Sequence, residues 1–488
     1  MAADWVAFAR FCLLVAAFHV CYASGVESLK PQTNTWNSSF TLSKAQIAAA
    51  NLSAAVANNV EVALNFERSN NAGNLIQNDP FYQLPDGLDL SKLPKPGTVL
   101  KVEAFTNTSF YTIPPSISMS RFLYVTETLN GSSAPASALV LWPYVPRHFQ
   151  SLKPSSAKPL NGQAVYPVVA WAHGTSGQTQ ACAPSGLRDL WDEFHLPYPL
   201  ALAGYAVVAP DYLGLGIANT TSPYFIFPSQ ANDVFHAIAA AQTHWPAQLS
   251  KQFVIAGQSQ GGGVAWSCAQ RQAKRPVDGY LGTFAASPFT DVLNIIAADK
   301  LAQNNARVAG IAQGLDSVYP GSQLTDWLTD AGIARLRLLQ QIKGCGLVGA
   351  QLLGDPDSTM LQDDWNTTSS AEWYRNVSTN GGKQFAGPML VTQGTEDPNA
   401  NEPVNTKMVN ETCTRFPQSQ LQYIRYEGIT HVPVLYAGQY LYLDWIRDRF
   451  AGVKVMQGCT QETLRPVRGM QSIGDDQNWF LEYDLYGL

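Results

Sequence analysis

Ser259 is the residue whose setting points most clearly to chemistry. It stands at the centre of Gly-Gln-Ser-Gln-Gly (257–261), directly after the apolar run 253–256 and directly before residues 262–273, which read as a helix. A serine held at a sharp turn between strand and helix needs neighbours almost without side chains, because the backbone must double back and leave the hydroxyl exposed. The motif alone is a weak match, but its context predicts a nucleophile elbow.

The general base follows by elimination. A serine hydroxyl requires a histidine to take its proton and a carboxylate to orient that histidine. On an elbow of this kind the chain order is serine, then acid, then histidine. Of the seven histidines only His431 lies downstream of Ser259; the others are at positions 19, 148, 173, 195, 236 and 244. If His431 were an ordinary loop or core histidine, the serine would have no partner.

The acid is expected at the end of a strand between these two residues. The short apolar run 388–393 is followed by the turn-forming cluster 394–398, and Asp397 is our choice within it. Glu396 is adjacent and remains open on chemical grounds, but successive residues at a strand end point in opposite directions. The alternative for Asp397 is a turn aspartate that accepts hydrogen bonds from its own backbone.

Acyl transfer also needs backbone N–H groups to stabilise the oxyanion. Gln260 supplies one from the start of the helix that follows the serine. A second is expected after an earlier strand, and the run 168–172 followed by His-Gly-Thr-Ser-Gly (173–177) meets that requirement. The N–H of Thr175 is the candidate, and its hydroxyl could add a further donor. The alternative is a turn threonine with no such role.

With these pieces in place, the chain resembles the fungal secretory lipase family of α/β-hydrolases, from about residue 78 to about residue 460. The resemblance rests on several motifs taken together: Asp-Pro-Phe-Tyr (79–82), Pro-Gly-Thr-Val-Leu (96–100), Cys-Ala-Pro-Ser (182–185), Gly-Tyr-Ala-Val-Val-Ala-Pro-Asp-Tyr (204–212), the elbow, and Gly-Thr-Glu-Asp (394–397). It implies a catalytic triad of Ser259, Asp397 and His431, with Thr175 and Gln260 in the oxyanion hole. One family member has an acidic residue at the position of Thr175, so only the backbone role carries over.

The order of the elements predicts an α/β fold with a mostly parallel, doubly wound sheet. Strand-like runs lie near 121–126, 138–142, 165–172, 205–210, 252–257, 279–285, 388–393 and 421–426. Residues 101–288 and 381–488 are expected to form this core. The N-terminal segment 25–100, with a helix expected at 42–66, is expected to wrap around it. Asp211 precedes Ser259 and is interpreted as a residue that bonds to backbone.

Between 289 and 380 the pattern becomes helical, which predicts a cap inserted between a core strand and the strand before Asp397. Its apolar residues recur at spacings of three or four: Val308, Ile311, Leu315, Leu324, Leu328, Ile333, Leu336, Leu339 and Ile342. A cap in this place would cover the serine, exclude water and supply an apolar acyl tunnel. The alternative, which we favour for most of these residues, is that they form the cap's own packing face.

The N-terminus predicts secretion. A short apolar region, 11–20, follows Arg10 and ends in small residues, so residues 1–24 are interpreted as a signal peptide. A membrane anchor is the alternative, but the run is short for a span, and no other run approaches about 18 residues. Asn-x-Ser/Thr sequons typical of a secreted glycoprotein lie at Asn37, Asn51, Asn107, Asn130, Asn219, Asn366, Asn376 and Asn410.

Cleavage of the signal removes Cys12 and Cys21 from the seven cysteines, and the remaining five cannot all pair within one chain. The family resemblance implies disulfides between Cys182 and Cys345 and between Cys413 and Cys459. The second would close a loop around His431, worth roughly 3 to 4 kcal/mol on a chain-entropy model. Cys268 is left over and is interpreted as a small buried residue rather than a reactive thiol.

Composition narrows the function classes. The 488 residues are 46% hydrophobic and 14% charged, with a net charge of −6, so the chain can bury a large core and offers no basic stripe for nucleic acid. Scattered histidines give no metal-ligand spacing, and no cofactor is called for. We therefore expect a secreted serine esterase or lipase that acts on carboxylic (acylglycerol-type) esters, with its lipid substrate at a lipid–water interface.

Three alternatives share this sequence pattern. An acyltransferase or lactone esterase acting on a specialised metabolite or glycolipid would use the same triad. A peptidase would also use it, although the lipase motifs argue against that reading. A binding protein without catalysis on a hydrolase fold would have no need of an intact triad.

Overall fold

The fold is described from a computed structural model of the chain, which describes residues 39–149, 165–191, 195–218, 220–298, 301 and 303–473. The signal peptide expected at 1–24 and the sequons at Asn37 and Asn219 lie outside these residues.

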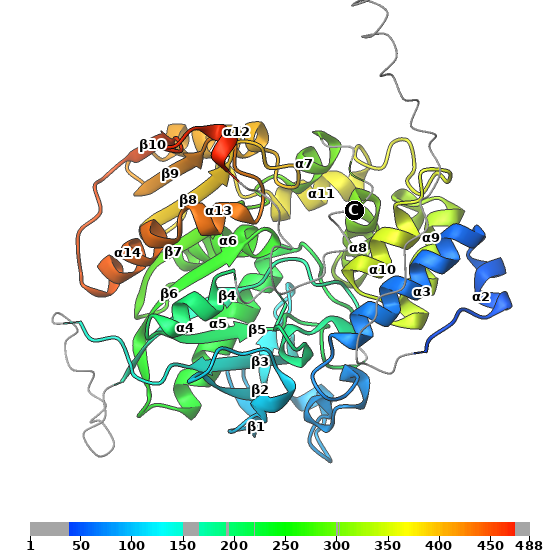
Figure 1. Ribbon diagram of the computed structural model, residues 1–488, viewed down its shortest axis with the longest axis horizontal. Coiled ribbons are helices and arrows are strands. Elements are labelled where there is room, and N and C mark those ends of the chain that lie inside the picture. The colour runs from blue at the N-terminus through cyan, green and yellow to red at the C-terminus, as the bar shows by residue number, and fades with distance from the viewer. Residues whose placement is uncertain are drawn as a thin grey trace, which may run out of the picture.

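One ten-stranded sheet forms the centre of the molecule, with strand order β1-β2-β3-β5-β4-β6-β7-β8-β9-β10 (Figure 1). The pairs from β1 to β5 are antiparallel, and all pairs from β5 through β4 to β10 are parallel. The strands are β1 (Val99–Glu103), β2 (Ser118–Glu127), β3 (Ser133–Trp142), β4 (Tyr166–Ala172), β5 (Ala206–Pro210), β6 (Leu249–Gln258), β7 (Tyr280–Ala286), β8 (Met389–Gly394), β9 (Leu421–Tyr426) and β10 (Cys459–Leu464). The predicted mostly parallel α/β sheet is confirmed.

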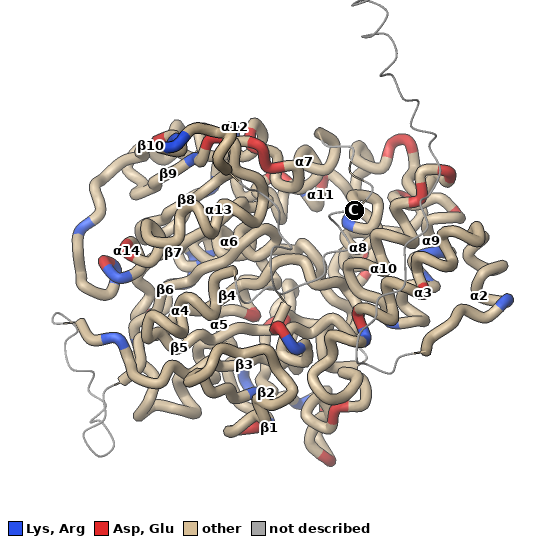
Figure 2. The backbone as a smooth tube through the Cα atoms, in the orientation of Figure 1, with Lys and Arg blue, Asp and Glu red and all other residues tan. Residues whose placement is uncertain are grey.

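Helices cover both faces of the sheet because both faces of its inner strands are apolar. In β4, Val168 and Ala170 join one hydrophobic cluster with α5 (Phe227–His244) and α6 (Gln260–Lys274). Val169 and Trp171 join a second cluster with α4 (Pro197–Leu202), α13 (Pro433–Ala437) and α14 (Gln439–Phe450). Strands β4, β5, β7 and β8 carry no charged residue (Figure 2), as expected for strands buried on both sides.

Every predicted strand is present, and the two that were not predicted lie at the sheet edges. All five residues of β1 are partly exposed, and most residues of β10 are exposed and polar, so neither shows a buried apolar pattern. The helix expected at 42–66 is divided into α2 (Lys44–Ala49) and α3 (Ala54–Ser69). The division follows from Asn51, which has a φ of 47°, and from Ser53, which caps the second helix.

Residues between β7 and β8 fold as helices beside one end of the sheet (Figure 1). They are α7 (Val292–Ala298), α8 (Gln303–Val318), α9 (Asp330–Ile342), α10 (Gly346–Leu353) and α11 (Ser369–Ser378), and α12 (Glu402–Arg415) follows β8. Their apolar stripe packs in one hydrophobic cluster, with only Leu324 partly exposed. We keep the name helical insertion for residues 292–378.

The N-terminal segment is fastened to this insertion. Helix α3 lies along α10 in Figure 1, and the two helices pack together. The buried guanidinium of Arg335 on α9 donates to the carbonyls of Ala50 and Asn51 and to Asp355, which lies 2.8 Å away. Because a buried charge is tolerated only with such partners, these contacts fix the segment 39–70 against the insertion.

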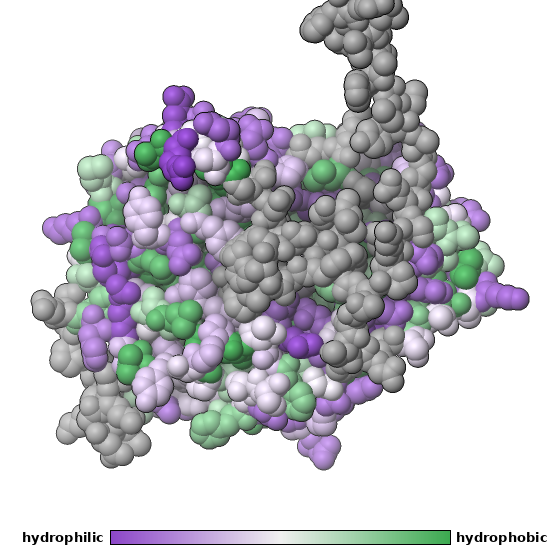
Figure 3. Space-filling model, viewed as in Figure 1, coloured by the Kyte–Doolittle hydropathy of each residue, from purple (hydrophilic) through white to green (hydrophobic). Residues whose placement is uncertain are grey.

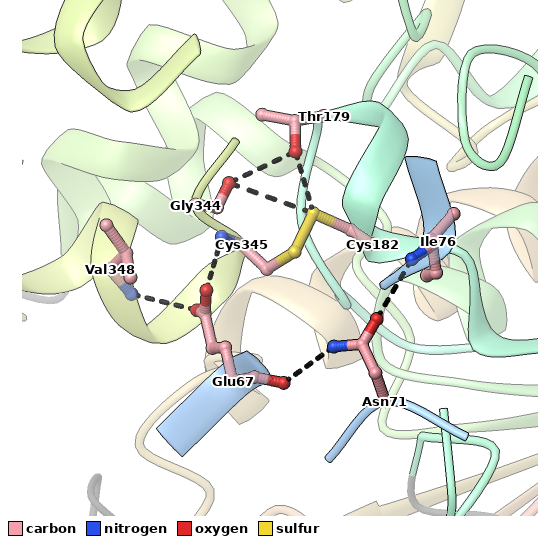
Figure 4. The surroundings of a disulfide bond; sticks show 8 residues. All are labelled: Glu67, Asn71, Ile76, Thr179, Cys182, Gly344, Cys345 and Val348. Carbon is pink, nitrogen blue, oxygen red and sulfur yellow. Dashed lines mark hydrogen bonds between the residues drawn. A yellow bond between two sulfur atoms is a disulfide. The ribbon is translucent and has the colours of Figure 1, made fainter. Parts of the chain in front are cut away.

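Both disulfides implied by the family resemblance are present. Cys182–Cys345 joins the loop after β4 to the start of α10, and Glu67 on α3 accepts the N–H groups of Cys345 and Val348 at 2.7 and 3.0 Å (Figure 4). With a sequence separation of 163 residues, this bond is worth about 5 kcal/mol on a chain-entropy model. Three segments far apart in the sequence are therefore held together at this point.

The other disulfide, Cys413–Cys459, ties α12 to the first residue of β10 and closes the loop that contains His431. Cys268 is the free, buried cysteine among the described residues, and burial raises the pKa of its thiol. It fits the interpretation of a small core residue.

The buried carboxyl group of Asp233 is expected to make the free energy of unfolding depend on pH. It accepts hydrogen bonds from Thr126 Oγ1 and Leu213 N–H, and burial raises its pKa to about 7 from an ordinary value of 3.8. Between these values the folded protein holds a proton that the unfolded chain releases. The stabilisation is therefore complete below pH 4 and is lost as the pH rises through 7.

We expect the free energy of unfolding of wild type to fall by about 2–4 kcal/mol from pH 4.5 to pH 8 on account of this group. Asp233→Asn should show a correspondingly smaller fall in urea titrations at these two pH values. If the free energy of unfolding falls by the same amount between pH 4.5 and pH 8 in Asp233→Asn as in wild type, Asp233 is not the group responsible.

Candidate active site

Ser259 lies on a strained turn between β6 and α6. Its φ of 60° and ψ of −123° are unfavourable for a residue with a Cβ atom, and only 8% of its surface is exposed. A Cβ atom on Gly261 would lie 1.8 Å from the carbonyl oxygen of Ala172, and one on Gly257 would lie 2.1 Å from the carbonyl oxygen of Gly261. The two glycines of the motif are therefore required by the close approach of the backbone at this turn.

His431 and Asp397 are brought together. Nδ1 of His431 lies 2.8 Å from Oδ2 of Asp397, and their side chains are 8% and 0% exposed. The other carboxylate oxygen, Oδ1, accepts the N–H groups of Asn399 and Ala400 at 2.9 and 2.8 Å. Gln393 Nε2 also donates to Oδ2 at 3.0 Å. An ionised carboxylate accepts the Nδ1 proton, so Nε2 of His431 is left free to take a proton.

Glu396 does not share this environment. Its side chain is exposed, whereas Asp397 is buried beside His431. Of the two neighbouring carboxylates, Asp397 is the one that contacts His431.

The loop that carries His431 lies against the elbow. The ring of Phe289 packs edge-on to the His431 ring with centroids 6.4 Å apart, and the N–H of Phe289 donates to the carbonyl of Ser259 at 3.3 Å. The side chain of Gln258 donates to the carbonyl of His431 at 3.5 Å. Two independent contacts therefore join the neighbourhood of the serine to the histidine.

The expected oxyanion donors also lie side by side. Thr175 Oγ1 donates to Gln260 Oε1 at 2.9 Å, and a Cβ atom on Gly174 would lie 3.7 Å from the Cβ atom of Ser259. Within the described residues, the N–H groups of Thr175 and Gln260 donate to no protein acceptor. Two free N–H groups next to a serine can stabilise negative charge on a substrate oxygen.

Tyr224 completes this arrangement and has no signal in the sequence. Its hydroxyl donates to Thr175 Oγ1 at 3.2 Å, which continues the chain of hydrogen bonds to Gln260. Burial raises the pKa of Tyr224 to about 12, so the hydroxyl stays protonated. A Cβ atom on Gly310 of α8 would lie 2.6 Å from its ring, so the helical insertion packs directly on it.

Tyr224→Phe should therefore lower kcat for an ester substrate about 3- to 10-fold with little change in KM, because it loosens Thr175 at the oxyanion site, an effect of about 1 kcal/mol. Tyr374→Phe is the matched control, since it removes a buried hydroxyl that donates to the carbonyl of Phe225 instead. Equal kcat losses in both variants would contradict a specific role for Tyr224.

His173 holds the first turn of the loop that carries Thr175. Its ring stacks on Tyr212 with centroids 4.1 Å apart, and its two ring nitrogens lie 2.7 Å from the carbonyl of Gly174 and 3.2 Å from that of Asp211. Burial lowers the pKa of His173 to about 4, so the ring is neutral. His173 directly follows β4, and its ring contacts Asp211 and Tyr212, which directly follow β5. Its role is therefore to position the loop after β4.

Asp211 has the structural role that its place before Ser259 suggested. Its carboxylate accepts the N–H of Ser185 and the hydroxyls of Ser185 and Ser137 at 2.6 to 2.8 Å. It thus accepts side-chain as well as backbone hydrogen bonds. Burial raises its pKa.

A further histidine, His195, lies near the site and was not singled out in the sequence. Its ring packs edge-on against Tyr436 with centroids 5.8 Å apart. Burial, with a smaller effect of the His431 charge, lowers the pKa of His195 to about 4. The His195 ring is therefore neutral near pH 7.

The outer surface mixes residue types. On the face shown in Figure 3, hydrophobic and hydrophilic residues alternate in small groups over the described part of the chain. None of the described helices is long and apolar enough to cross a membrane.

Known proteins share this architecture. The family model of the alpha/beta hydrolase family matches residues 169–443, which is more than half of the chain. No curated protein sequence gives a significant match. The fold is similar to Candida antarctica lipase A in its closed state, with a TM-score of 0.61 and 16% identity over 80% of this chain and 90% of that chain. It is also similar to the rice cell wall degrading esterase LipA from Xanthomonas oryzae, with a TM-score of 0.53 and 18% identity over 72% and 100% of the two chains.

At these identities the likeness to solved structures establishes the fold, and the family match covers the elbow, Asp397 and His431. The chain therefore belongs to the alpha/beta hydrolase family.

Proposed function

We propose that the protein is a secreted serine esterase that hydrolyses carboxylic esters of the acylglycerol type through an acyl-enzyme. The observation that carries this proposal is the buried hydrogen bond between His431 and Asp397 beside a serine on a strained elbow. This arrangement would supply the nucleophile, the base and the residue that orients the base, which acyl transfer requires.

In the first half-reaction, Ser259 Oγ attacks the ester carbonyl while Nε2 of His431 takes the hydroxyl proton. Asp397 stabilises the imidazolium and keeps Nδ1 protonated. The N–H groups of Thr175 and Gln260 bind the developing oxyanion, and Tyr224 holds Thr175 in place. The protonated His431 then donates its proton to the leaving alcohol.

In the second half-reaction, water replaces the alcohol. His431 takes a proton from this water as the water attacks the acyl-enzyme. The protonated His431 then returns the proton to Ser259 Oγ as the bond to the acyl group breaks and the acid leaves. The helical insertion lies beside the site through Gly310 and Tyr224, and we assign to it the role of a cap that limits access of water. Every step uses residues of this chain alone.

Three observations support the finer points of the proposal. The two disulfides suit an oxidising, extracellular setting. One structural neighbour is a lipase and another is an esterase that degrades cell walls, so both act on ester-type substrates. The helical insertion packs on Tyr224 through Gly310 of α8, which places it next to the candidate site.

The test is hydrolysis of a series of p-nitrophenyl esters, from acetate to palmitate, by the secreted protein. We expect turnover on this series, with a long-chain optimum for a lipase and a short-chain optimum for a general esterase. A parallel assay adds an alcohol acceptor. If ester product exceeds free acid in that assay, the protein is an acyltransferase with the same triad; no turnover by folded protein on any ester would contradict the proposal.

A further inference from the structure

A groove lined by aromatic side chains lies on the surface far from the serine. It has a volume of about 490 Å³, within the range of about 300–1,000 Å³ typical of ligand pockets. Phe105 and Tyr144 form its rim and are 91% and 82% exposed. Its base includes Trp142, which packs edge-on against Tyr166 and Trp245 with centroids 5.8 and 5.3 Å apart.

The groove is separate from the proposed active site. Tyr166 is the first residue of β4, and Gln248 directly precedes β6. Ser259 and Thr175 follow the opposite ends of these two strands. Because the two strands are parallel, the groove lies at their N-terminal ends and the serine at their C-terminal ends, on opposite sides of the sheet along the strand direction. A lipid surface bound in the groove would face away from Ser259, so an acyl substrate does not explain it.

No charged side chain lines the groove among the described residues, and serine hydroxyls and the Gln248 amide stand beside the aromatic rings. This combination suits a neutral molecule with both apolar faces and hydroxyl groups. Sugar rings have this chemistry, because their C–H faces stack on aromatic rings while their hydroxyls form hydrogen bonds. Among the groove residues that the structure describes, an anionic headgroup or an acidic peptide would find no cation.

A sequon stands at the rim of the groove. Asn107 follows Phe105 by two residues, in the turn after β1, and its side chain is exposed. Its Oδ1 accepts the N–H and the hydroxyl of Ser109 at 3.1 and 2.8 Å. Within the described residues, Nδ2 of Asn107 donates to no protein group. The atom that would be glycosylated is therefore free, and an exposed aromatic ring lies next to it in sequence.

We propose that Asn107 carries an N-linked oligosaccharide whose first sugars stack on Phe105 and extend into the aromatic groove. In the attachment step, Nδ2 loses a proton and bonds to the anomeric carbon of a lipid-linked diphospho-oligosaccharide. The bond from that carbon to the lipid diphosphate breaks, and the diphosphate leaves with the electron pair, its added negative charge balanced by the proton released from Nδ2. The inference rests on the secretion that is part of the proposed function.

Asn130 provides a matched comparison within the same chain. It is also an exposed turn residue, and its Oδ1 likewise accepts the N–H of the serine two positions later, at 3.2 Å. The residue two positions before it is Thr128 rather than an aromatic residue. Oδ1 of Asn130 also accepts the hydroxyl of Thr128 at 2.6 Å, whereas Oδ1 of Asn107 accepts that of Ser109. A glycan on Asn130 therefore starts from a similar turn without an aromatic residue two positions before it.

The first experiment measures occupancy and protection on protein secreted from yeast. Glycopeptide mass spectrometry should find Asn107 occupied. Endoglycosidase H acting on the folded protein should release the Asn107 glycan several-fold more slowly than the Asn130 glycan. Phe105→Ala should bring the release rate at Asn107 up to that at Asn130, whereas Tyr440→Ala, which removes a ring 66% exposed on α14, should leave it unchanged.

The second experiment measures whether the sugar and the ring stabilise each other. Phe105→Ala should lower the Tm of the glycosylated protein by about 1–2 °C. It should have no such effect in the Asn107→Gln background, which carries no glycan at this site. The double-mutant comparison separates stacking from any effect of Phe105 on the folded chain.

Three outcomes would overturn the proposal. An unoccupied Asn107 in a protein that is glycosylated at other sequons would do so while leaving secretion intact. Equal release rates at Asn107 and Asn130 would show that the glycan points into solvent. A Tm loss for Phe105→Ala of the same size in the Asn107→Gln background would assign Phe105 a role without the sugar. If the protein carries no glycan at any sequon, the secretory part of the proposed function fails as well.

Discussion

Replacing Ser259, the proposed nucleophile, with alanine is expected to lower kcat for a p-nitrophenyl ester by about 10⁵- to 10⁶-fold, as loss of the nucleophile does in serine hydrolases. Ser259 stands where β6 meets α6, beside the proposed oxyanion donors at Thr175 and Gln260. The residual rate would come from substrate binding and the oxyanion site alone. The measurement is kcat under saturating substrate, together with the Tm of each variant.

Ser267→Ala is the control for this substitution, because Ser267 is a buried serine on the same helix, α6. It should keep kcat within a factor of about two, since removal of a buried hydroxyl away from the site affects stability instead. Alanine keeps the Cβ atom and with it the backbone strain at this position, so the Tm of Ser259→Ala should stay close to that of wild type. A Ser259→Ala variant that retains more than a tenth of wild-type activity would contradict the assignment of the nucleophile.

Asp397→Asn is expected to lower kcat by about 10⁴-fold, since the amide keeps the shape but favours the wrong tautomer of the histidine. In wild type, the carboxylate accepts the Nδ1 proton of His431 and is itself held by the N–H groups of Asn399 and Ala400. An asparagine that donates to Nδ1 would place the proton on Nε2, where the base must be free. KM should change little.

Glu396→Gln is the matched control, because Glu396 is the adjacent carboxylate and its side chain is exposed. It should change kcat by less than about threefold, as expected for a surface charge. If Glu396→Gln lowers kcat more than Asp397→Asn does, the exposed carboxylate is the functional acid and the His431–Asp397 contact is structural.

The elbow could be predicted from the sequence because steric contacts within the turn require its glycines. At positions 257 and 261, a Cβ atom would lie within about 2 Å of a carbonyl oxygen, so only glycine fits. A requirement for glycine can be read directly from the sequence. His431 was found because few histidines exist and chain order excludes the others. The inner strands were found because both their faces are apolar.

The parts that could not be predicted depend on contacts between distant segments. Tyr224 has no local pattern, and its importance comes from Thr175 and from Gly310, which lie far from it in sequence. The edge strands β1 and β10 are partly exposed and polar, so hydrophobic periodicity does not reveal them. The prediction of a single helix over 42–66 was wrong, because Asn51 adopts a left-handed backbone conformation. The periodicity of the apolar residues in this segment does not reveal that conformation.

The most direct test of the central claim is covalent capture of the nucleophile. The folded protein is treated with a p-nitrophenyl alkylphosphonate, which mimics the tetrahedral intermediate, and the labelled peptide is identified by mass spectrometry. We predict one equivalent of p-nitrophenol released and one phosphonyl group on Ser259, with activity lost in the same proportion. A phosphonyl group on another residue, or full inactivation without a label on Ser259, would contradict the account.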